Sequence, residues 1–242
     1  MDNTVEKTET GAILYDRAVL NQISDATFVP ATWMSAKPVS GYLQSAGRGN
    51  TVILSDGQRH FVMRHFRRGG LAARVSQDSY LWLGEDRTRS FTEFRLLAEL
   101  VSRSLPVPPP VAARYRRTGI LYSADIITAL VPGIQPLAAR ILEKADRDFW
   151  ERMGAGIARF HQAGVNHADL NAYNVQVDRN DEILVLDFDR GRLMQEGSWQ
   201  QSNLARLQRS LEKIKRLDQR SSFSADAWEA LLAGYSAAAG SA

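Results

Sequence analysis

The sequence predicts an α+β fold of two lobes, an antiparallel sheet with one inserted helix followed by a reduced helical lobe. Short β-prone segments separated by turns fill residues 26–130, whereas long stretches with helical periodicity dominate residues 131–242. Pro132 and Gly133, which interrupt both helices and strands, mark the break between the lobes. With 242 residues, 44% of them hydrophobic, the chain can bury one large core or two small ones that share an interface.

The composition narrows the class of protein. The chain has no cysteine, which excludes disulfides and thiolate metal sites. Its first residues are polar and lack the apolar segment of a signal peptide, and its apolar runs fall far short of the roughly 20 residues of a membrane-spanning helix. We therefore expect a soluble, cytoplasmic protein.

The first lobe has the pattern of an antiparallel meander. We expect residues 1–25 to form a weakly ordered or helical leader before it. Three short β-prone segments follow, separated by glycine-containing turns, and an Asp-Gly pair between the second and third is typical of a hairpin. These strands are expected at residues 41–45, 51–54 and 60–64.

A helix is inserted into the meander. Its apolar residues recur at helical spacing over residues 88–104, and a proline-rich stretch from Pro106 to Pro110 ends it, because prolines remove backbone donors and hold the chain extended. Two further strands, at residues 112–116 and 120–130, complete the lobe of residues 26–130.

The second lobe, residues 131–242, is mostly helical. One β-hairpin, of residues 175–177 and 183–186, interrupts the helices. The helix at residues 198–217 has apolar residues on one side and basic residues nearby, so it either packs on the core with a solvated basic face or lies on a membrane. We expect helices at residues 136–144, 146–163, 198–217 and 224–238.

The residues with the clearest chemistry follow the second of these helices. Asp169 is followed five residues later by Asn174, and Asp187 ends the next apolar run. Phosphoryl transfer needs a carboxylate that accepts or orients the proton of the acceptor hydroxyl, and hard oxygen ligands for Mg²⁺ on the nucleotide phosphates. Asp169 fits the first role, and Asn174 and Asp187 fit the second. His167 is expected to pack under this loop rather than to act as a base.

The spacing H-x-D-L-x-x-x-N followed by D-F-x, between a strand-led and a helical lobe, resembles the protein-kinase-like fold. The resemblance implies a glycine-rich loop over the triphosphate, which Gly47 and Gly49 would form, unless they only make a hairpin turn. It also implies a phosphate-binding Lys on the third strand, where this chain has Arg64. Arginine keeps the charge but presents a larger planar fork.

The same resemblance implies a Glu in the inserted helix as the ion-pair partner of Arg64. Glu93 is the best match and Glu99 the alternative. Ser90 and Glu93 also fit a helix capping box, in which Glu93 would fold back to the Ser90 amide, so both interpretations stay open. About 50 residues follow Arg192, too few for the activation segment and full helical lobe of a eukaryotic protein kinase. The chain therefore resembles a small-molecule phosphotransferase.

A basic segment stands out between Asp56 and Asp78, where arginines accumulate and no acidic residue occurs. Such a cluster is typical of a site for phosphates, nucleic acid or an anionic membrane, or it is only a solvated basic face. Nucleic acid is not expected, since no base-stacking aromatic repeat or binding motif accompanies the cluster.

Within the basic segment, residues 61–70 (FVMRHFRRGG) resemble the R-H-Y/F-R-R-G-G signature of the bacterial 3-deoxy-D-manno-octulosonic acid kinase (Kdo kinase) family. The resemblance covers most of the chain from about Tyr42 to Leu211. It implies ATP and Mg²⁺ as cofactors and transfer of the γ-phosphoryl group to the 4-hydroxyl of a Kdo sugar on a lipid A precursor. A heptose or other core-sugar kinase and a nucleotide-binding pseudokinase scaffold are the alternatives. Further matches lie at residues 90–94, 105–114, 122–128, 166–174 and 187–192.

An acceptor of this kind, Kdo-lipid A, carries a sugar carboxylate and lipid phosphates at the cytoplasmic face of the inner membrane. The resemblance therefore implies peripheral association with that anionic surface. Guanidinium groups bind carboxylate and phosphate through paired hydrogen bonds, so the candidate acceptor contacts are Arg67, Arg68, Arg190 and Arg192.

Overall fold

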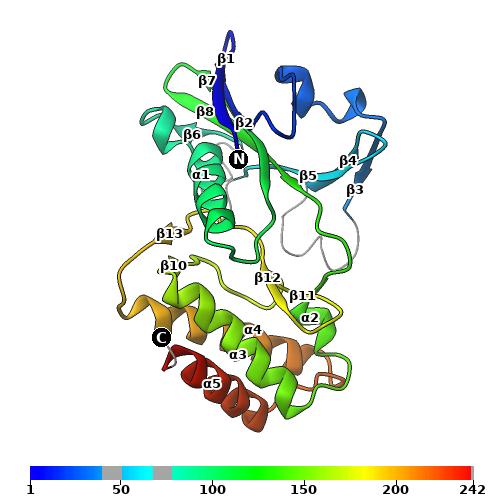
Figure 1. Ribbon diagram of the computed structural model, residues 1–242, viewed down its shortest axis with the longest axis vertical. Coiled ribbons are helices and arrows are strands. Elements are labelled where there is room, and N and C mark those ends of the chain that lie inside the picture. The colour runs from blue at the N-terminus through cyan, green and yellow to red at the C-terminus, as the bar shows by residue number, and fades with distance from the viewer. Residues whose placement is uncertain (40–50, 68–77, 241–242) are drawn as a thin grey trace. The chain divides into compact units, whose positions relative to one another are not determined.

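The computed structural model describes residues 1–39, 51–67 and 78–240, and the chain divides into two compact units. Unit 1 comprises Met1–Ser102 and Pro108–Leu130, and unit 2 comprises Arg103–Val107 and Val131–Ala242. The predicted α+β class is confirmed, with the large sheet and helix α1 in unit 1 and the other α-helices in unit 2 (Figure 1). The change of unit after Leu130 falls where the sequence predicts the break between lobes.

Unit 1 is built on an antiparallel sheet in the order β1-β2-β7-β8-β5-β4-β3, with β6 paired to β8. The predicted strands at residues 51–54, 60–64, 112–116 and 120–130 are confirmed, while residues 41–45 lie outside the described part. The strands are β1 Asn3–Lys7, β2 Gly11–Asp16, β3 Ser35–Pro38, β4 Thr51–Ser55, β5 His60–His65, β6 Tyr80–Leu81, β7 Pro110–Thr118 and β8 Leu121–Ala129.

The expectation of a weakly ordered or helical leader at residues 1–25 is wrong. Strands β1 and β2 form a hairpin, and β2 continues the sheet by pairing with β7. The short run Ala12–Tyr15 is buried, and a Cβ at Gly11 would come within 2.1 Å of the Tyr115 carbonyl oxygen. Six residues of strand are too few to show a clear period, so only the pairing with β7 reveals this element.

Helix α1, Arg89–Ser102, packs on β7 and β8. Its core face is formed by Phe91, Phe94, Leu97 and Leu100, all essentially inaccessible to solvent. The apolar periodicity of the inserted helix therefore marks the core of unit 1.

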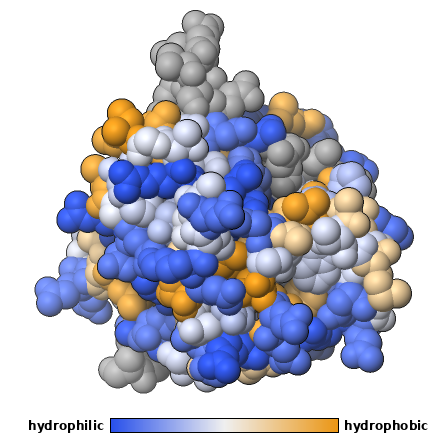
Figure 2. All heavy atoms as spheres, turned by 90° about the horizontal axis from the view of Figure 1, so that it is seen from above, coloured by the Kyte–Doolittle hydropathy of each residue, from blue (hydrophilic) through white to orange (hydrophobic). Residues whose placement is uncertain are grey.

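Seen from above, the surface in Figure 2 is largely hydrophilic, and the hydrophobic side chains, coloured orange, lie in separate small groups.

Helix α3 of unit 2 begins after Asp146. The Asp146 side chain accepts a 2.9 Å hydrogen bond from the Phe149 amide. α3 packs on α5, as Figure 1 shows, and a Cβ at Gly154 or Gly234 would lie within about 2 Å of backbone oxygens of the facing helix. The elements are β9 Gln135–Pro136, α2 Leu137–Arg140, α3 Arg147–Gln162, β10 Val165–Asn166, β11 Val175–Val177, β12 Ile183–Val185, β13 Arg192–Leu193, α4 Trp199–Leu217 and α5 Ala225–Ala239.

Two helix predictions for unit 2 are refined by the structure. The helix expected over residues 136–144 stops at Arg140, and the Ile141 carbonyl instead accepts hydrogen bonds from the backbone and side chain of Ser222. The apolar side of α4 faces the core, since Leu204, Leu207, Leu211 and Ile214 are buried. No helix in the described part of the chain is both long and apolar enough to cross a bilayer.

Candidate active site

The loop between β10 and β11 is held in shape by two asparagine side chains. The Asn171 side-chain oxygen accepts hydrogen bonds from the amides of Tyr173 (2.9 Å) and Asn174 (3.1 Å). The Asn174 side-chain amide reaches back to donate to the carbonyl of Asp169 at 2.9 Å. Asparagines satisfy loop backbone in this way because their short side chains reach groups a few residues away. The spacing of Asp169 and Asn174 is therefore also what closes the loop.

The Asp169 carboxylate projects from this loop into solvent. Its side chain is 63% exposed, and the loop is held through its backbone groups rather than through the carboxylate. The Oδ1 atom lies 3.5 Å from Nη1 of Arg206 on α4. An exposed carboxylate on a rigid loop is available to a hydroxyl of a bound substrate, as the predicted role of Asp169 requires.

His167 is buried under the loop, so that part of its prediction is confirmed. Its Nδ1 accepts from the Asp169 amide (3.2 Å), and its Nε2 lies 2.9 Å from the Leu186 carbonyl, which can only accept. The proton must therefore sit on Nε2 of a neutral ring. Burial lowers the pKa of His167, and its ring packs edge-on against Phe188. A neutral imidazole with both ring nitrogens in hydrogen bonds supports the loop and does not serve as a base.

The Asn174 oxygen has the properties of a cation ligand. Asn174 is 1% exposed, and its Oδ1 atom meets no hydrogen-bond donor in the described residues. A buried amide oxygen without a donor is unfavourable unless something else satisfies it, and amide oxygens are hard ligands that suit Mg²⁺. Asn174 thus fits the metal role that its sequence position predicts.

The backbone segment before Asp187 is hydrogen-bonded to Asn174, because the Leu186 amide donates to the Asn174 carbonyl at 2.9 Å. The Asp187 φ of 60° is left-handed, which is uncommon outside glycine and often occurs at functional turns. The described residues contain no cluster of three His, Cys, Asp or Glu side chains suited to a metal. Any cation held here would also need phosphate oxygens, as is usual for Mg²⁺ on a nucleotide.

Three side chains of α4 contact the loop, and none was predicted from the sequence to be a site residue. The Asn203 oxygen accepts from the His167 amide (3.1 Å), and the Ser210 hydroxyl accepts from the Ala172 amide (3.2 Å). Arg206 lies between them in sequence and reaches Asp169. Spacings of three and four residues put all three on one helix face. The only sequence signal was polar residues beside the apolar stripe of an amphipathic helix.

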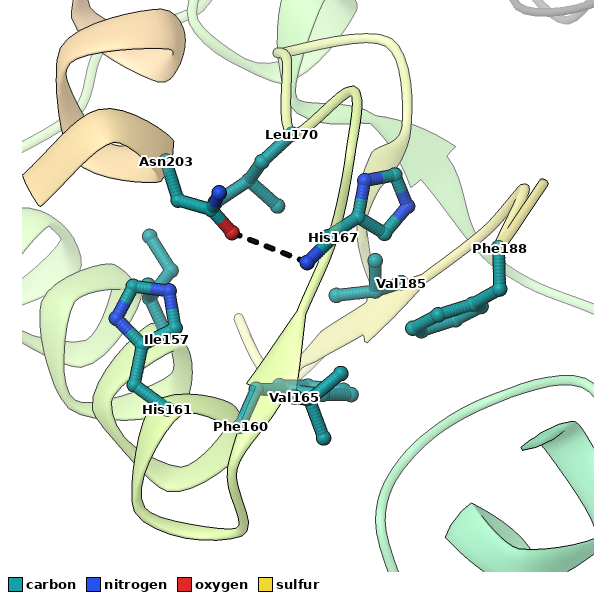
Figure 3. A pocket seen from close by; sticks show the side chains of 9 residues that line it. All are labelled: Ile157, Phe160, His161, Val165, His167, Leu170, Val185, Phe188 and Asn203. Atoms are coloured by element: carbon teal, nitrogen blue, oxygen red, sulfur yellow. Dashed lines mark hydrogen bonds between the residues drawn. The ribbon is translucent and has the colours of Figure 1, made fainter. Parts of the chain in front are cut away.

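The space beneath the loop is a small, mostly apolar cavity (Figure 3). Figure 3 shows Asn203 directed at the His167 backbone on one side of it, with His161 on α3 nearby. Burial lowers the pKa of His161 to about 4, so this ring is neutral near pH 7. The residues that line this cavity support the loop. They are Ile157, Phe160, His161, Val165, His167, Leu170, Val185, Phe188 and Asn203.

Arg190 and Arg192 follow the Asp187 turn and are exposed. Arg192 lies on β13, in register with Asn166, the residue directly before His167. The backbone of Arg192 is therefore next to the start of the loop that carries Asp169. This placement is compatible with the predicted acceptor role, which stays a prediction.

In unit 1, Arg64 and Glu93 form the ion pair that the sequence suggested. Arg64 Nη2 lies 2.6 Å from both carboxylate oxygens of Glu93, whose side chain is only 4% exposed. The capping-box alternative is wrong, because Ser90 lies within α1 and its hydroxyl donates to the Arg114 carbonyl. Glu99, the alternative partner, lies on the exposed side of α1. Whether Arg64 binds phosphate stays a prediction.

Of the remaining predicted residues of unit 1, the structure describes Arg67. Arg67 is exposed, and its Nε lies 3.6 Å from an oxygen of Asp78. Gly47, Gly49 and Arg68 lie outside the described residues. The nucleotide role of the glycines and the acceptor role of the two arginines therefore stay predictions.

A buried charge network next to Arg64 was not foreseen. His65 Nδ1 lies 2.7 Å from Asp125, and Arg114 contacts the other oxygen of the same carboxylate at 2.8 Å. Burial by itself raises the pKa of Asp125, but the His65 hydrogen bond and the Arg114 charge hold that pKa below its usual value. These contacts join β5, β7 and β8, so part of the basic segment stabilises the sheet.

We expect Arg64→Met to lower kcat/KM for ATP by about 10- to 100-fold, the loss typical of one charge-assisted hydrogen bond. The same change leaves the buried Glu93 carboxylate without its guanidinium and destabilises unit 1. The double variant Arg64→Met/Glu93→Gln removes that penalty, so it recovers thermal stability without recovering ATP use. Steady-state kinetics and thermal unfolding of both variants measure the two effects separately.

Two further variants sharpen this prediction. Arg64→Lys keeps the charge but not the planar fork, and we expect partial activity. Arg59→Met removes an exposed arginine that pairs with Asp56 in a turn, and we expect little change. Wild-type kinetics for Arg64→Met would remove Arg64 from nucleotide binding and point to a neighbouring arginine.

Comparison with known proteins adds to this geometry. Residues 34–235 match the model of the lipopolysaccharide kinase (Kdo/WaaP) family. Over 207 residues the chain is 46% identical to a 3-deoxy-D-manno-octulosonic acid kinase from Stenotrophomonas maltophilia (strain K279a). Proteins of the same name from Xylella fastidiosa (strain M12) and Xanthomonas campestris pv. campestris (strain B100) are 44% and 45% identical. Each alignment covers 85% of this chain and 82% of the relative.

Proposed function

The chain belongs to the lipopolysaccharide kinase (Kdo/WaaP) family, and we propose that it transfers the γ-phosphoryl group of ATP to the 4-hydroxyl of the Kdo sugar on Kdo-lipid A. It is a phosphotransferase that acts on a sugar hydroxyl. The relatives named as 3-deoxy-D-manno-octulosonic acid kinases support Kdo as the acceptor sugar. That this Kdo sugar is carried on lipid A is a further part of the proposal.

The observation that carries the chemistry is one loop that presents an exposed carboxylate at Asp169 and, at Asn174, a buried oxygen that meets no donor among the described residues. In the proposed reaction Asp169 hydrogen-bonds the acceptor hydroxyl, orients its oxygen and takes its proton. Asn174 and Asp187 would hold Mg²⁺, which when bound neutralises charge on the ATP phosphates. The left-handed conformation of Asp187 supports this proposed role, because such conformations often occur at functional sites.

Arg64 is the proposed contact to the α- and β-phosphates. Its Nη2 atom contacts both carboxylate oxygens of Glu93, and the guanidinium lies over the Phe66 ring, 4.6 Å from the ring centroid. A fork held on two sides is pre-organised, so it loses little conformational entropy when it binds an anion. Gly47 and Gly49 are the proposed backbone contacts to the triphosphate.

The test of the proposed function is phosphate transfer from labelled ATP to three samples: Kdo-lipid A, a heptose-bearing core oligosaccharide, and buffer alone. Phosphate found by NMR on the Kdo 4-hydroxyl supports the proposal. Transfer to heptose alone would favour the core-sugar alternative. ATP binding without any transfer would favour the pseudokinase alternative.

We expect the double variant Arg67→Ala/Arg68→Ala to raise KM for Kdo-lipid A while leaving KM for ATP nearly unchanged. The proposal places the enzyme on the cytoplasmic, anionic face of the inner membrane, where arginines contact the sugar carboxylate and lipid phosphates. The variant is also expected to bind anionic vesicles more weakly, with a difference that shrinks as salt screens the charges. Unchanged acceptor kinetics and vesicle binding would mean that this cluster is only a solvated basic face.

A further inference from the structure

Helix α4 fixes the position of Arg206 relative to Asp169. Asn203 and Ser210, one turn before and one turn after Arg206, each hold a backbone amide of the loop. Because both neighbours on this helix face are bonded to the loop, the Arg206 backbone cannot move independently of Asp169. Its side chain nevertheless remains 47% exposed. The protein therefore holds a solvent-accessible guanidinium at a set place beside the proposed catalytic carboxylate.

This ion pair contributes little to folding. The two side chains are about half exposed or more, and the Nη1 to Oδ1 distance of 3.5 Å is long for a charged hydrogen bond. Exposed pairs of this kind add little to stability, because water and salt screen the attraction and two long side chains lose freedom. The contact uses Nη1, whereas a guanidinium has five N–H donors. Arg206 can thus contact a substrate without cost to the fold.

The proposed acceptor needs a cation at this position. In Kdo the carboxylate is attached to the ring carbon next but one to the carbon that bears the 4-hydroxyl, so both groups lie on the same small ring. A 4-hydroxyl that is hydrogen-bonded to Asp169 therefore brings the sugar carboxylate close to the Asp169 carboxylate. Two like charges at short range repel each other, and a guanidinium beside them offsets that repulsion. Neutral heptose has no carboxylate and needs no such cation.

From these contacts we infer that Arg206 binds the carboxylate of the acidic sugar and so selects it over neutral sugars. The inference rests on the proposed function, since it concerns the acceptor of the same reaction. Arg190 and Arg192 are the other candidates in unit 2. Within the described residues, Arg206 is the arginine whose side chain contacts Asp169. A bidentate contact from this guanidinium would both hold and orient the ring.

The test combines a change in the enzyme with a matching change in the substrate. Initial rates are measured with Kdo-lipid A and with the same lipid after its Kdo carboxylate has been reduced to an alcohol. For Arg206→Ala we expect kcat/KM to fall by about 10- to 100-fold with the native acceptor and by less than about threefold with the reduced one. KM for ATP stays unchanged, and Arg206→Lys recovers part of the activity. Arg209→Ala, also exposed on α4, is the matched control and leaves both acceptors unaffected.

Two outcomes would overturn the inference. An equal loss with both acceptors would mean that Arg206 acts through Asp169 and not on the sugar carboxylate. No loss with the native acceptor would mean that the ion pair has no part in acceptor binding. Failure of the proposed function is seen separately, because the wild-type enzyme would then not phosphorylate Kdo-lipid A at all.

Discussion

Asp187→Ala is expected to abolish magnesium-dependent ATP binding. Loss of a group that hydrogen-bonds a metal ligand already lowers metal affinity by about 10- to 100-fold. Loss of the ligand carboxylate itself should lower it further. The backbone adds a second effect, because Asp187 has a φ of 60° and alanine tolerates this conformation poorly. We therefore also expect a loss of about 1 kcal/mol in the free energy of unfolding.

Asparagine at position 187 separates the two effects of this substitution. Asp187→Asn suits the left-handed turn, so it keeps wild-type stability but still lacks the carboxylate. Titration of ATP with and without Mg²⁺ measures the metal dependence, and thermal unfolding measures the fold. Asp181→Asn is the matched control, since Asp181 is also left-handed (φ 57°) but lies in the turn between β11 and β12. Because an asparagine oxygen is itself a Mg²⁺ ligand, the cation would be assigned to other ligands only by a wild-type metal dependence in both Asp187→Asn and Asp187→Ala.

The parts of the candidate site that were predictable from the sequence are those set by local spacing. Asp169 and Asn174 lie within one loop that is closed by the hydrogen bond from the Asn174 side chain to the Asp169 carbonyl, so a short motif contains both. The Arg64 and Glu93 pair came from a resemblance, and residues alone could not separate it from a capping box. That alternative depends on where the helix begins and on which group Ser90 contacts, and only the packing of α1 on β7 decides both.

The support of the loop by α4 could not be predicted, because it depends on contacts far apart in the chain. Asn203 follows His167 by 36 residues, and no spacing rule joins an asparagine in a helix to a particular loop amide. The charge network around Asp125 was missed for the same reason, since His65 lies 60 residues before it. The β-prone segments of the sequence predicted β4, β5, β7 and β8 but not β1 and β2, whose short pattern becomes meaningful only when β7 is beside them.

Asp169→Asn is expected to lower kcat by about 10²- to 10⁴-fold, the usual cost of losing a general base or an orienting carboxylate. ATP affinity should stay within a few-fold, because the nucleotide and metal contacts are assigned to other residues. The fold should also stay intact. Asparagine has nearly the same shape, and the loop is bonded to the backbone groups of Asp169 while its carboxylate is 63% exposed.

The measurements for Asp169→Asn are single-turnover transfer to Kdo-lipid A, ATP binding and thermal unfolding. Glu212→Gln is the control for loss of one negative charge, since Glu212 is exposed on α4 and outside the loop, and it should retain wild-type kcat. A variant that folds, binds ATP and transfers phosphate at the wild-type rate would remove Asp169 from the chemical step. A large loss of kcat with unchanged ATP binding and stability would support a role of Asp169 in the step in which the acceptor hydroxyl reacts. The two other functions of the loop, holding its shape and carrying Asn174, do not depend on this carboxylate.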